Sequence, residues 1–208
     1  MSMKKILQIP LLLVALFLTS IPISAHDFEV DGIYYNVIDE AAKTVEVTYR
    51  GNYSSAYDNE YTGSVTIPDS VTYSGTYYSV ISIGSSAFYG CTGLTSITIP
   101  NSVTTIAYQA FLGCPNLESI EVESGNSIYD SRDNCNAIIE TKSNTLIFGC
   151  ASTIIPSSVK SIGDGAFAGC SNLTSITLPE YLYDMGDYVF TGCNSLSEIN
   201  GKPLSYAS

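Results

Sequence analysis

A phenylalanine, a glycine and a cysteine recur together four times in this chain. Of these three residue types, cysteine is the one whose side chain can take part in chemical reactions. The segments are AFYGC (87–91), AFLGC (110–114), AFAGC (166–170) and VFTGC (189–193). Cysteines in a fixed pattern point to a zinc site, a disulfide framework, a nucleophilic enzyme, or packing without any reaction. Their spacing and the rest of the sequence separate these alternatives.

Spacing and the shortage of histidine argue against metal binding and catalysis. No two cysteines form a C-x-x-C pair, and neighbouring cysteines lie 15 or more residues apart. Hydrolases with a serine or cysteine nucleophile need a histidine base, and the only histidine is His26. In DSRDNCN (130–136), Arg132 stands where a calcium loop needs an oxygen ligand, so a turn is expected there. We expect no catalytic residue, no metal and no cofactor.

The cysteines belong to a longer repeat. Gap-free copies of 23 residues occupy 99–121, 155–177 and 178–200, and a further copy, 67–98, has nine extra residues in its first half. Each copy ends in L-x-x-I with alternating apolar residues, which predicts a short strand with one buried face. The A-F segment predicts one helical or 3₁₀ turn. A unit this small cannot fold alone, so the copies must stack, with their strands in one parallel ladder.

The pattern I-P-x-x-V-x-x-I-G-x-x-A-F-x-G-C-x-x-L-x-x-I resembles the BspA-like (treponemal-type) leucine-rich repeat over about 67–200. The resemblance implies a mainly β fold with short helical or 3₁₀ turns, built as a right-handed leucine-rich-repeat solenoid. It also implies an exported or surface protein, and for some members adhesion to host extracellular proteins. No catalytic residues come with this family.

The domain organisation expected from the sequence has four parts. Lys4 and Lys5, an apolar run (6–18) and small residues before Ala25 predict a signal peptide. A solenoid needs a cap over its first coil, and the strand-like runs before the repeats suit that role. The expected parts are a signal peptide (1–25), a β-rich N-terminal cap (26–66), a leucine-rich-repeat solenoid (67–200) with a β-hairpin-like irregular segment at 122–154, and a C-terminal tail (201–208).

Charge restricts the partners of the chain. The net charge is −12, and removal of the leader takes away two lysines, which makes it −14. A chain this acidic repels phosphate backbones and anionic lipids, so neither nucleic acid nor membrane-surface binding is expected. The apolar run of the leader is too short for a comfortable membrane span, so no membrane insertion after signal cleavage is expected either. We expect an exported protein, whether secreted, periplasmic or at the cell surface.

Two cysteines outside the repeated motif form a separate case. In the irregular segment, the runs NAIIE and TLIFG flank TKSN and predict a hairpin in which Glu140 faces Thr145. Cys135 then faces Cys150. The sequence leaves open whether these two form a disulfide or are small buried hydrophobes. A peptide map without reduction distinguishes the two.

The cysteines of the repeated motif are predicted to be structural. Equivalent strands in a stack lie about 4.8 Å apart with parallel side chains, whereas a disulfide needs converging ones. The expectation is a column of reduced, buried cysteines beside a column of stacked phenylalanines. The cysteines are Cys91, Cys114, Cys170 and Cys193, and the phenylalanines are Phe88, Phe111, Phe167 and Phe190.

What remains for function is the surface. Side chains next to the buried ones on the repeat strands should point outward as a hydroxyl-rich face that suits a protein partner or simply solvates the strands. We name these residues the strand face: Ser96, Thr98, Ser119, Glu121, Ser175, Thr177, Glu198 and Asn200. The sequence favours a non-enzymatic protein that mediates protein–protein interaction or adhesion. The alternative is a structural protein that forms a homo-oligomer through an open C-terminal strand edge.

Overall fold

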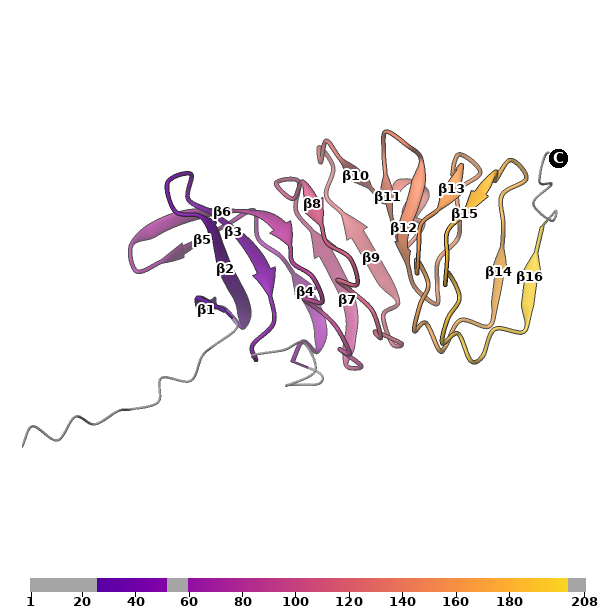
Figure 1. The fold of residues 1–208 in the computed structure, drawn as a ribbon, viewed down its shortest axis with the longest axis horizontal. Coiled ribbons are helices and arrows are strands. Elements are labelled where there is room, and N and C mark those ends of the chain that lie inside the picture. Colours follow the sequence, from indigo (N-terminus) through magenta and orange to yellow (C-terminus); the bar gives the residue numbers. More distant parts are fainter. Residues whose placement is uncertain (1–25, 52–59, 202–208) are drawn as a thin grey trace, which may run out of the picture.

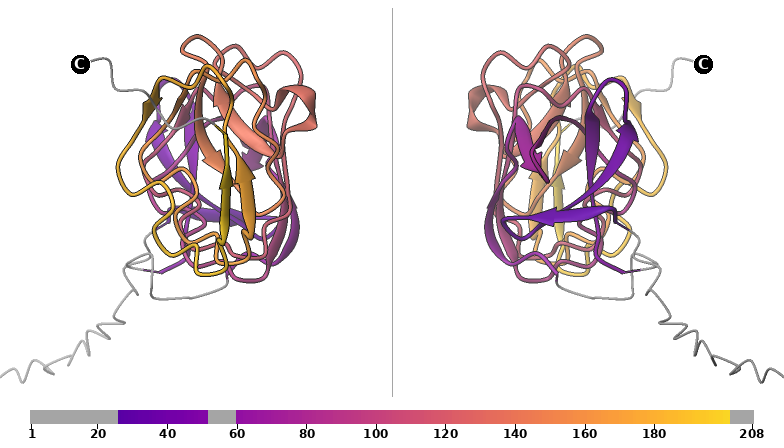
Figure 2. Two further views of the ribbon diagram at one scale, coloured as in Figure 1. Left: turned by 90° about the vertical axis from the view of Figure 1, so that its right-hand side faces the viewer. Right: turned by 90° about the vertical axis from the view of Figure 1, so that its left-hand side faces the viewer.

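The computed structural model describes residues 26–51 and 60–201, which are almost entirely strands and turns. The only helix in these ranges is a short 3₁₀ helix, η1 (Arg132–Asn134). Figure 1 shows the strands following one another along the long axis, and the end-on views of Figure 2 show successive segments overlying one another. The predicted mainly β fold is confirmed. The predicted signal peptide (1–25) lies outside the described residues, as does all of the predicted tail except Gly201.

The N-terminal residues form a mixed sheet of six strands. These are β1 (Phe28–Val30), β2 (Ile33–Asp39), β3 (Thr44–Thr48), β5 (Ser70–Tyr73), β6 (Thr76–Ile83) and β8 (Thr105–Ile106). Their order is β1-β2-β3-β6-β5, with β8 beside β6. Ser74 and Gly75 both have positive φ, as the tight turn of a hairpin requires, and this β5–β6 hairpin holds the extra residues of the 67–98 copy.

Parallel strands pair with an offset equal to the repeat length. Ile97 lies opposite Ile120, and Ile162 lies opposite Met185, each pair 23 positions apart. This register stacks each apolar position on its counterpart. The strands paired at this offset are β7 (Leu94–Ile99) with β9 (Ser119–Val122), β13 (Ser161–Ile162) with β15 (Asp184–Met185), and β14 (Ser175–Thr177) with β16 (Glu198–Asn200). Strand β4 (Gly63–Thr66) is also parallel to β7, but Val65 lies opposite Ile97, 32 positions away.

The motif residues form the corners between strands. Where a helical or 3₁₀ turn was predicted around A-F, the chain makes consecutive tight turns instead. The N–H of Cys170 donates to the carbonyl of Phe167, and the N–H of Leu173 donates to the carbonyl of Cys170. The same bonds recur around Cys91 and Cys193. The spacing of phenylalanine, cysteine and leucine in the motif therefore matches the spacing of the residues that hydrogen-bond within these turns.

The irregular segment contains the predicted hairpin, with β11 (Ala137–Glu140) and β12 (Thr145–Gly149) antiparallel and β10 (Tyr129–Asp130) beside β11. Glu140 lies opposite Thr145, as predicted. A bulge between Ile138 and Ile139 then shifts the register by one residue.

Because of that bulge, the prediction that Cys135 faces Cys150 is wrong. The carbonyl of Cys135 accepts a hydrogen bond from the N–H of Ile154, while the thiol of Cys150 lies 3.4 Å from the carbonyl oxygen of Asn136. Both cysteines are buried and free, and they belong to different hydrophobic clusters.

The irregular segment also interrupts the predicted single ladder. In the described ranges β9 pairs with β7 alone and β14 with β16 alone, so the strands form two parallel sheets. At the corners, in contrast, the copies on either side of the irregular segment are in direct contact. A Cβ built on Gly169 would lie 2.9 Å from the Cα of Gly113, although the irregular segment lies between these residues in the sequence.

The predicted phenylalanine column is broken at the same place. Phe88 stacks on Phe111 with ring centroids 5.0 Å apart, and Phe111 contacts Phe148 at 4.9 Å. Phe167 and Phe190 form a separate stack at 5.6 Å. The core accordingly divides into two clusters.

Gly149 explains the break. Its N–H donates to the carbonyl of Ala166, which is the bond that Phe88 makes to Ala110 in the regular part of the chain. Gly149 thus stands at a phenylalanine position, and a Cβ there would lie 2.4 Å from an edge atom of the Phe167 ring. The Phe167 side chain fills the volume that a side chain at position 149 would need.

Substitution of Gly149 by alanine should therefore destabilise the fold. We expect Gly149→Ala to lower the free energy of unfolding by about 1–3 kcal/mol, because the added methyl group displaces a buried ring. The control is Gly163→Ala, where the nearest atom would lie at an ordinary 3.5 Å. Urea denaturation of both variants measures the difference, and equal stabilities would refute this account of the break.

Candidate functional site

The repeated cysteines make contacts between successive copies of the motif. The thiol of Cys114 donates to the carbonyl of Phe88, and that of Cys193 to the carbonyl of Phe167, each at 3.1 Å. The thiol of Cys170 donates to the carbonyl of Gly149, which occupies the phenylalanine position, at 3.4 Å. Each thiol satisfies a carbonyl at the preceding corner, so these cysteines pack and cross-link by hydrogen bonds. All are free, and Cys193 is only partly buried, in contrast to the predicted buried column.

Burial also suppresses the reactivity of these thiols. Burial raises the pKa of Cys170 to about 12, and it raises the pKa of Cys114 further. The pKa values of Cys135 and Cys193 are raised for the same reason. A thiol with a raised pKa is neutral near pH 7 and is a poor nucleophile and metal ligand. The cysteines of the motif, which could have been catalytic, are therefore weak nucleophiles in this structure.

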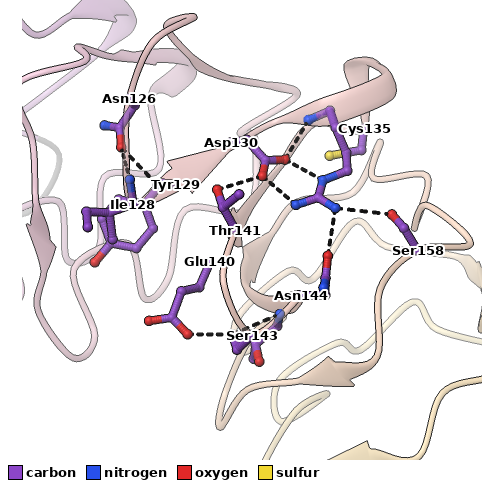
Figure 3. A network of polar contacts seen from close by, with 12 residues as sticks. Asn126, Ile128, Tyr129, Asp130, Cys135, Glu140, Thr141, Ser143, Asn144 and Ser158 are labelled. Atoms are coloured by element: carbon purple, nitrogen blue, oxygen red, sulfur yellow. Dashed lines mark hydrogen bonds and ion pairs between the residues drawn. The ribbon is translucent and has the colours of Figure 1, made fainter.

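The segment that was weighed as a calcium loop folds around an arginine. The guanidinium of Arg132 donates to both carboxylate oxygens of Asp130, at 2.7 and 2.5 Å, and to Asn144 at 2.7 Å. Figure 3 shows Asp130, Asn144 and Ser158 converging on this point from separate segments. Burial raises the pKa of Asp130, but hydrogen bonds from Arg132 and Thr141 outweigh it, and the net pKa is lowered. Asp130 is therefore an ionised partner of Arg132. The network of hydrogen bonds holds the parts of the irregular segment around Asp130 and Asn144 together.

The strand register brings the strand-face residues together in cross-strand pairs. Ser96 lies opposite Ser119, and Thr98 opposite Glu121, on β7 and β9. On β14 and β16 the pairs are Ser175 with Glu198 and Thr177 with Asn200. Ser96 and Thr98 are half-buried and the other six are exposed. The strand face thus has two halves, because β9 and β14 do not pair.

A groove that the sequence did not reveal lies beside the second half. It has a volume of about 560 Å³ and is lined by Ile154, Ser175 and Thr177, among others. Ile154 is 76% exposed, the most exposed aliphatic side chain in the described ranges. Segment 150–155, which contains Ile154, forms no strand, and the repeat pattern of the sequence did not indicate this exposure.

Metal and membrane features were sought across residues 26–51 and 60–201. No group of three or more His, Cys, Asp or Glu side chains is placed there to hold a metal ion. His26 hydrogen-bonds through Nδ1 to the Arg50 carbonyl and lies against the ring of Tyr34. No helix in these ranges has the length and apolar character needed to span a bilayer.

Comparison with known proteins identifies relatives of this architecture. A family model described as the BspA type leucine rich repeat region, in six copies, matches residues 52–148 and 147–205. No curated protein matches the chain significantly.

Several solved structures are similar. A leucine-rich repeat protein from Bacteroides ovatus is 34% identical with a TM-score of 0.53, over 84% of this chain and 41% of that one. One from Eubacterium ventriosum is 25% identical with a TM-score of 0.46, over 67% and 42%. The T. pallidum leucine rich repeat protein is 22% identical with a TM-score of 0.39, over 84% and 64%. This chain therefore spans about two-fifths of the length of the first two.

The cysteine environment predicts a pattern of thiol reactivity. In denaturant without reductant, all six thiols should react with a disulfide reagent. In the native protein at about pH 8, Cys193 should react first, and the five buried thiols at least ~100-fold more slowly, because burial keeps the reagent away from their sulfur atoms. The slow rates should rise with pH toward about 12 for Cys170.

The control for this pattern is Cys193→Ser, which should remove only the fast phase. Four reactive thiols in denaturant instead of six would mean that a disulfide forms after all. Mass mapping would then identify the bonded pair.

Proposed function

This chain belongs to the BspA-type leucine-rich repeat family, and from that premise we propose that it is an exported, non-enzymatic protein that binds another protein along its strand face. Its architecture in this proposal is a right-handed leucine-rich-repeat solenoid over 67–200, capped by residues 26–66. The 23-residue offset between paired strands supports the solenoid. The mixed sheet, whose strand β6 pairs with β8 of the next copy, supports the cap.

The observation that carries the binding proposal is the arrangement of the strand face around Ile154. Six of its eight side chains are exposed, and all have short or flexible polar groups that adapt to a partner. Ile154 adds an exposed apolar side chain beside the second half, and a few well-packed central residues carry most of the affinity of an interface. The weak reactivity of the cysteines supports the absence of catalysis.

Localisation is the second part of the proposal. A basic and apolar leader before Ala25 supports export, and the shortage of charged residues suits an extracellular β protein. The partner is then another extracellular protein, and a host matrix protein is one such class. The net charge of −12 argues against nucleic acid as the partner.

Bulky charged substitutions on the strand face should abolish binding. Purified extracellular-matrix proteins are immobilised one at a time, and binding of residues 26–208 is measured by surface plasmon resonance. Where binding occurs, we expect Ser119→Arg with Thr177→Arg to weaken it by at least about 10-fold, because two exposed hydroxyl positions become obstructed.

The matched control is Ser124→Arg with Ser195→Arg, which adds the same groups at exposed positions off β7, β9, β14 and β16. The strand face is excluded as the binding surface if both double variants bind equally. Failure of every matrix protein to bind counts against adhesion.

Self-association is the second candidate, and Ile199 is the observation that favours it. Ile199 is 52% exposed, whereas its counterparts Ile120 and Ile176 are each 3% exposed. In the described ranges β16 pairs with β14 alone. A strand edge beside an exposed isoleucine suits a second copy of the chain.

Light scattering over a range of concentrations tests this candidate. If the edge self-associates, the wild-type mass should rise toward two chains, and Ile199→Lys should remain at one chain because the charge cannot be buried. Asn200→Lys adds the same charge to the outward side of β16 and should still associate. A wild-type mass of one chain at every concentration eliminates this candidate.

A further inference from the structure

A cavity of about 550 Å³ lies where the irregular segment interrupts the stack of corners. One wall is the corner of the 99–121 copy, including Tyr108 and Phe111, and the opposite wall is the corner of the 155–177 copy, including Asp164. The floor includes Phe148 of β12. This volume is within the usual range for ligand sites.

The cavity lies where the hairpin of the irregular segment replaces a regular corner. In the regular part, the N–H groups of Phe88 and Phe167 donate to carbonyls of the following corner, Ala110 and Val189. The equivalent N–H of Phe111 has no hydrogen-bond partner anywhere in the described chain. Phe111 lines the cavity, so this unused donor stands at the position where the next corner would otherwise lie.

The lining combines aromatic rings with negative charge. Tyr108 and Tyr188 are 65% and 76% exposed at the rim. Glu140 and Asp164 are the charged residues of the lining, and none of its described residues is Lys, Arg or His. The hydrogen bonds of these two carboxylates use Oε2 of Glu140 and Oδ1 of Asp164, which leaves the other oxygen of each for a ligand.

Tyr188 is held in an unfavourable backbone conformation at this rim. Its φ is 57°, and the equivalent positions of the other copies, Ser86, Gln109 and Gly165, have φ of 58°, 59° and 60°. A left-handed conformation costs a non-glycine residue roughly 1–2 kcal/mol. Because this conformation belongs to the corner of every copy, Tyr188 is distinguished by its large aromatic ring, which is 76% exposed and lines the cavity.

We propose that this cavity binds a peptide segment of a partner protein in which an apolar or aromatic residue precedes an arginine or lysine. The apolar side chain lies among Tyr108, Phe148 and Tyr188, the cationic group reaches Glu140 and Asp164, and a peptide carbonyl accepts from the N–H of Phe111. Charge complementarity selects the cation, because both charged groups of the lining are acidic. This site is separate from the strand face and does not depend on it.

The test uses two capped dipeptides, acetyl-Phe-Arg-amide and acetyl-Phe-Glu-amide, titrated into residues 26–208 at low salt. The arginine peptide should saturate with a Kd below about 1 mM and shift the amide resonances of Tyr108, Phe111 and Ala168. The glutamate peptide should bind at least ~5-fold more weakly, because partly exposed ion pairs contribute modestly. Equal binding of the two, shifts elsewhere, or no saturable shift would overturn the proposal.

Two double variants separate local charge from overall charge. Glu140→Gln with Asp164→Asn keeps the size and the acceptor atoms of both side chains, so the fold should persist while the preference for arginine disappears. Glu121→Gln with Glu198→Gln changes the net charge equally on the strand face and should keep that preference. If both lose the preference alike, only the net charge of the chain attracts the peptide, and the site is refuted.

A blocking variant checks the location. Thr191 is exposed and lines the cavity, so Thr191→Phe should abolish binding, whereas Thr174→Phe, at an exposed position outside the lining, should not. Retained binding in the blocking variant places the peptide elsewhere and refutes the proposal. These measurements need no matrix protein, so they stand or fall separately from the strand-face experiment.

Discussion

Close approach of successive corners is the contact on which the rest of this structure depends. Backbone N–H groups at one corner donate to carbonyls of the next, as Gly169 does to Thr191 at 2.8 Å. The approach is closest at Gly169, where an added Cβ would lie 2.9 Å from the Cα of Gly113, whereas a Cβ on Gly192 would meet the Cα of Gly169 at an ordinary 3.4 Å. The glycine of the motif has positive φ in all four copies. Backbone conformation therefore favours glycine at every corner, and lack of space requires it at Gly169.

The irregular segment shows what happens when one unit departs from this rule. Its hairpin takes the place of a corner, Gly149 stands where phenylalanine is expected, and the rings of Phe148 and Phe167 do not stack on each other. The core divides, and so does the ladder of outer strands. Both hollows described above, the groove beside Ile154 and the cavity beside Tyr108, lie at this break. Departure from the repeat is thus where the molecule gains surfaces that an unbroken stack lacks.

The residue types of this chain that could react contribute to its packing instead: all six cysteines are free and five of them are buried. The thiol of Cys114 is neutral because it is buried and donates to a carbonyl. Asp130, in contrast, stays ionised because the guanidinium of Arg132 donates hydrogen bonds to both of its carboxylate oxygens. What the surface offers a partner is hydroxyl groups, tyrosine rings and an excess of acids. This chemistry favours recognition over catalysis.

The sequence by itself determined the repeat and the elements that local patterns encode. Period, strand positions, corner glycines and the β11–β12 hairpin follow from local patterns, and the pairing of Ser119 with Ser96 follows from the 23-residue offset. It did not reveal the bulge after Ile138, the exchange of Phe for Gly149, or the exposure of Ile154. These depend on volumes and registers at one place, where segments distant in the chain meet and no second copy exists to compare. The repeat pattern of a sequence describes the environment that a position has in most copies. Only the tertiary structure decides at which copy that environment differs, because the difference depends on contacts between distant segments. The cavity lies at such a place.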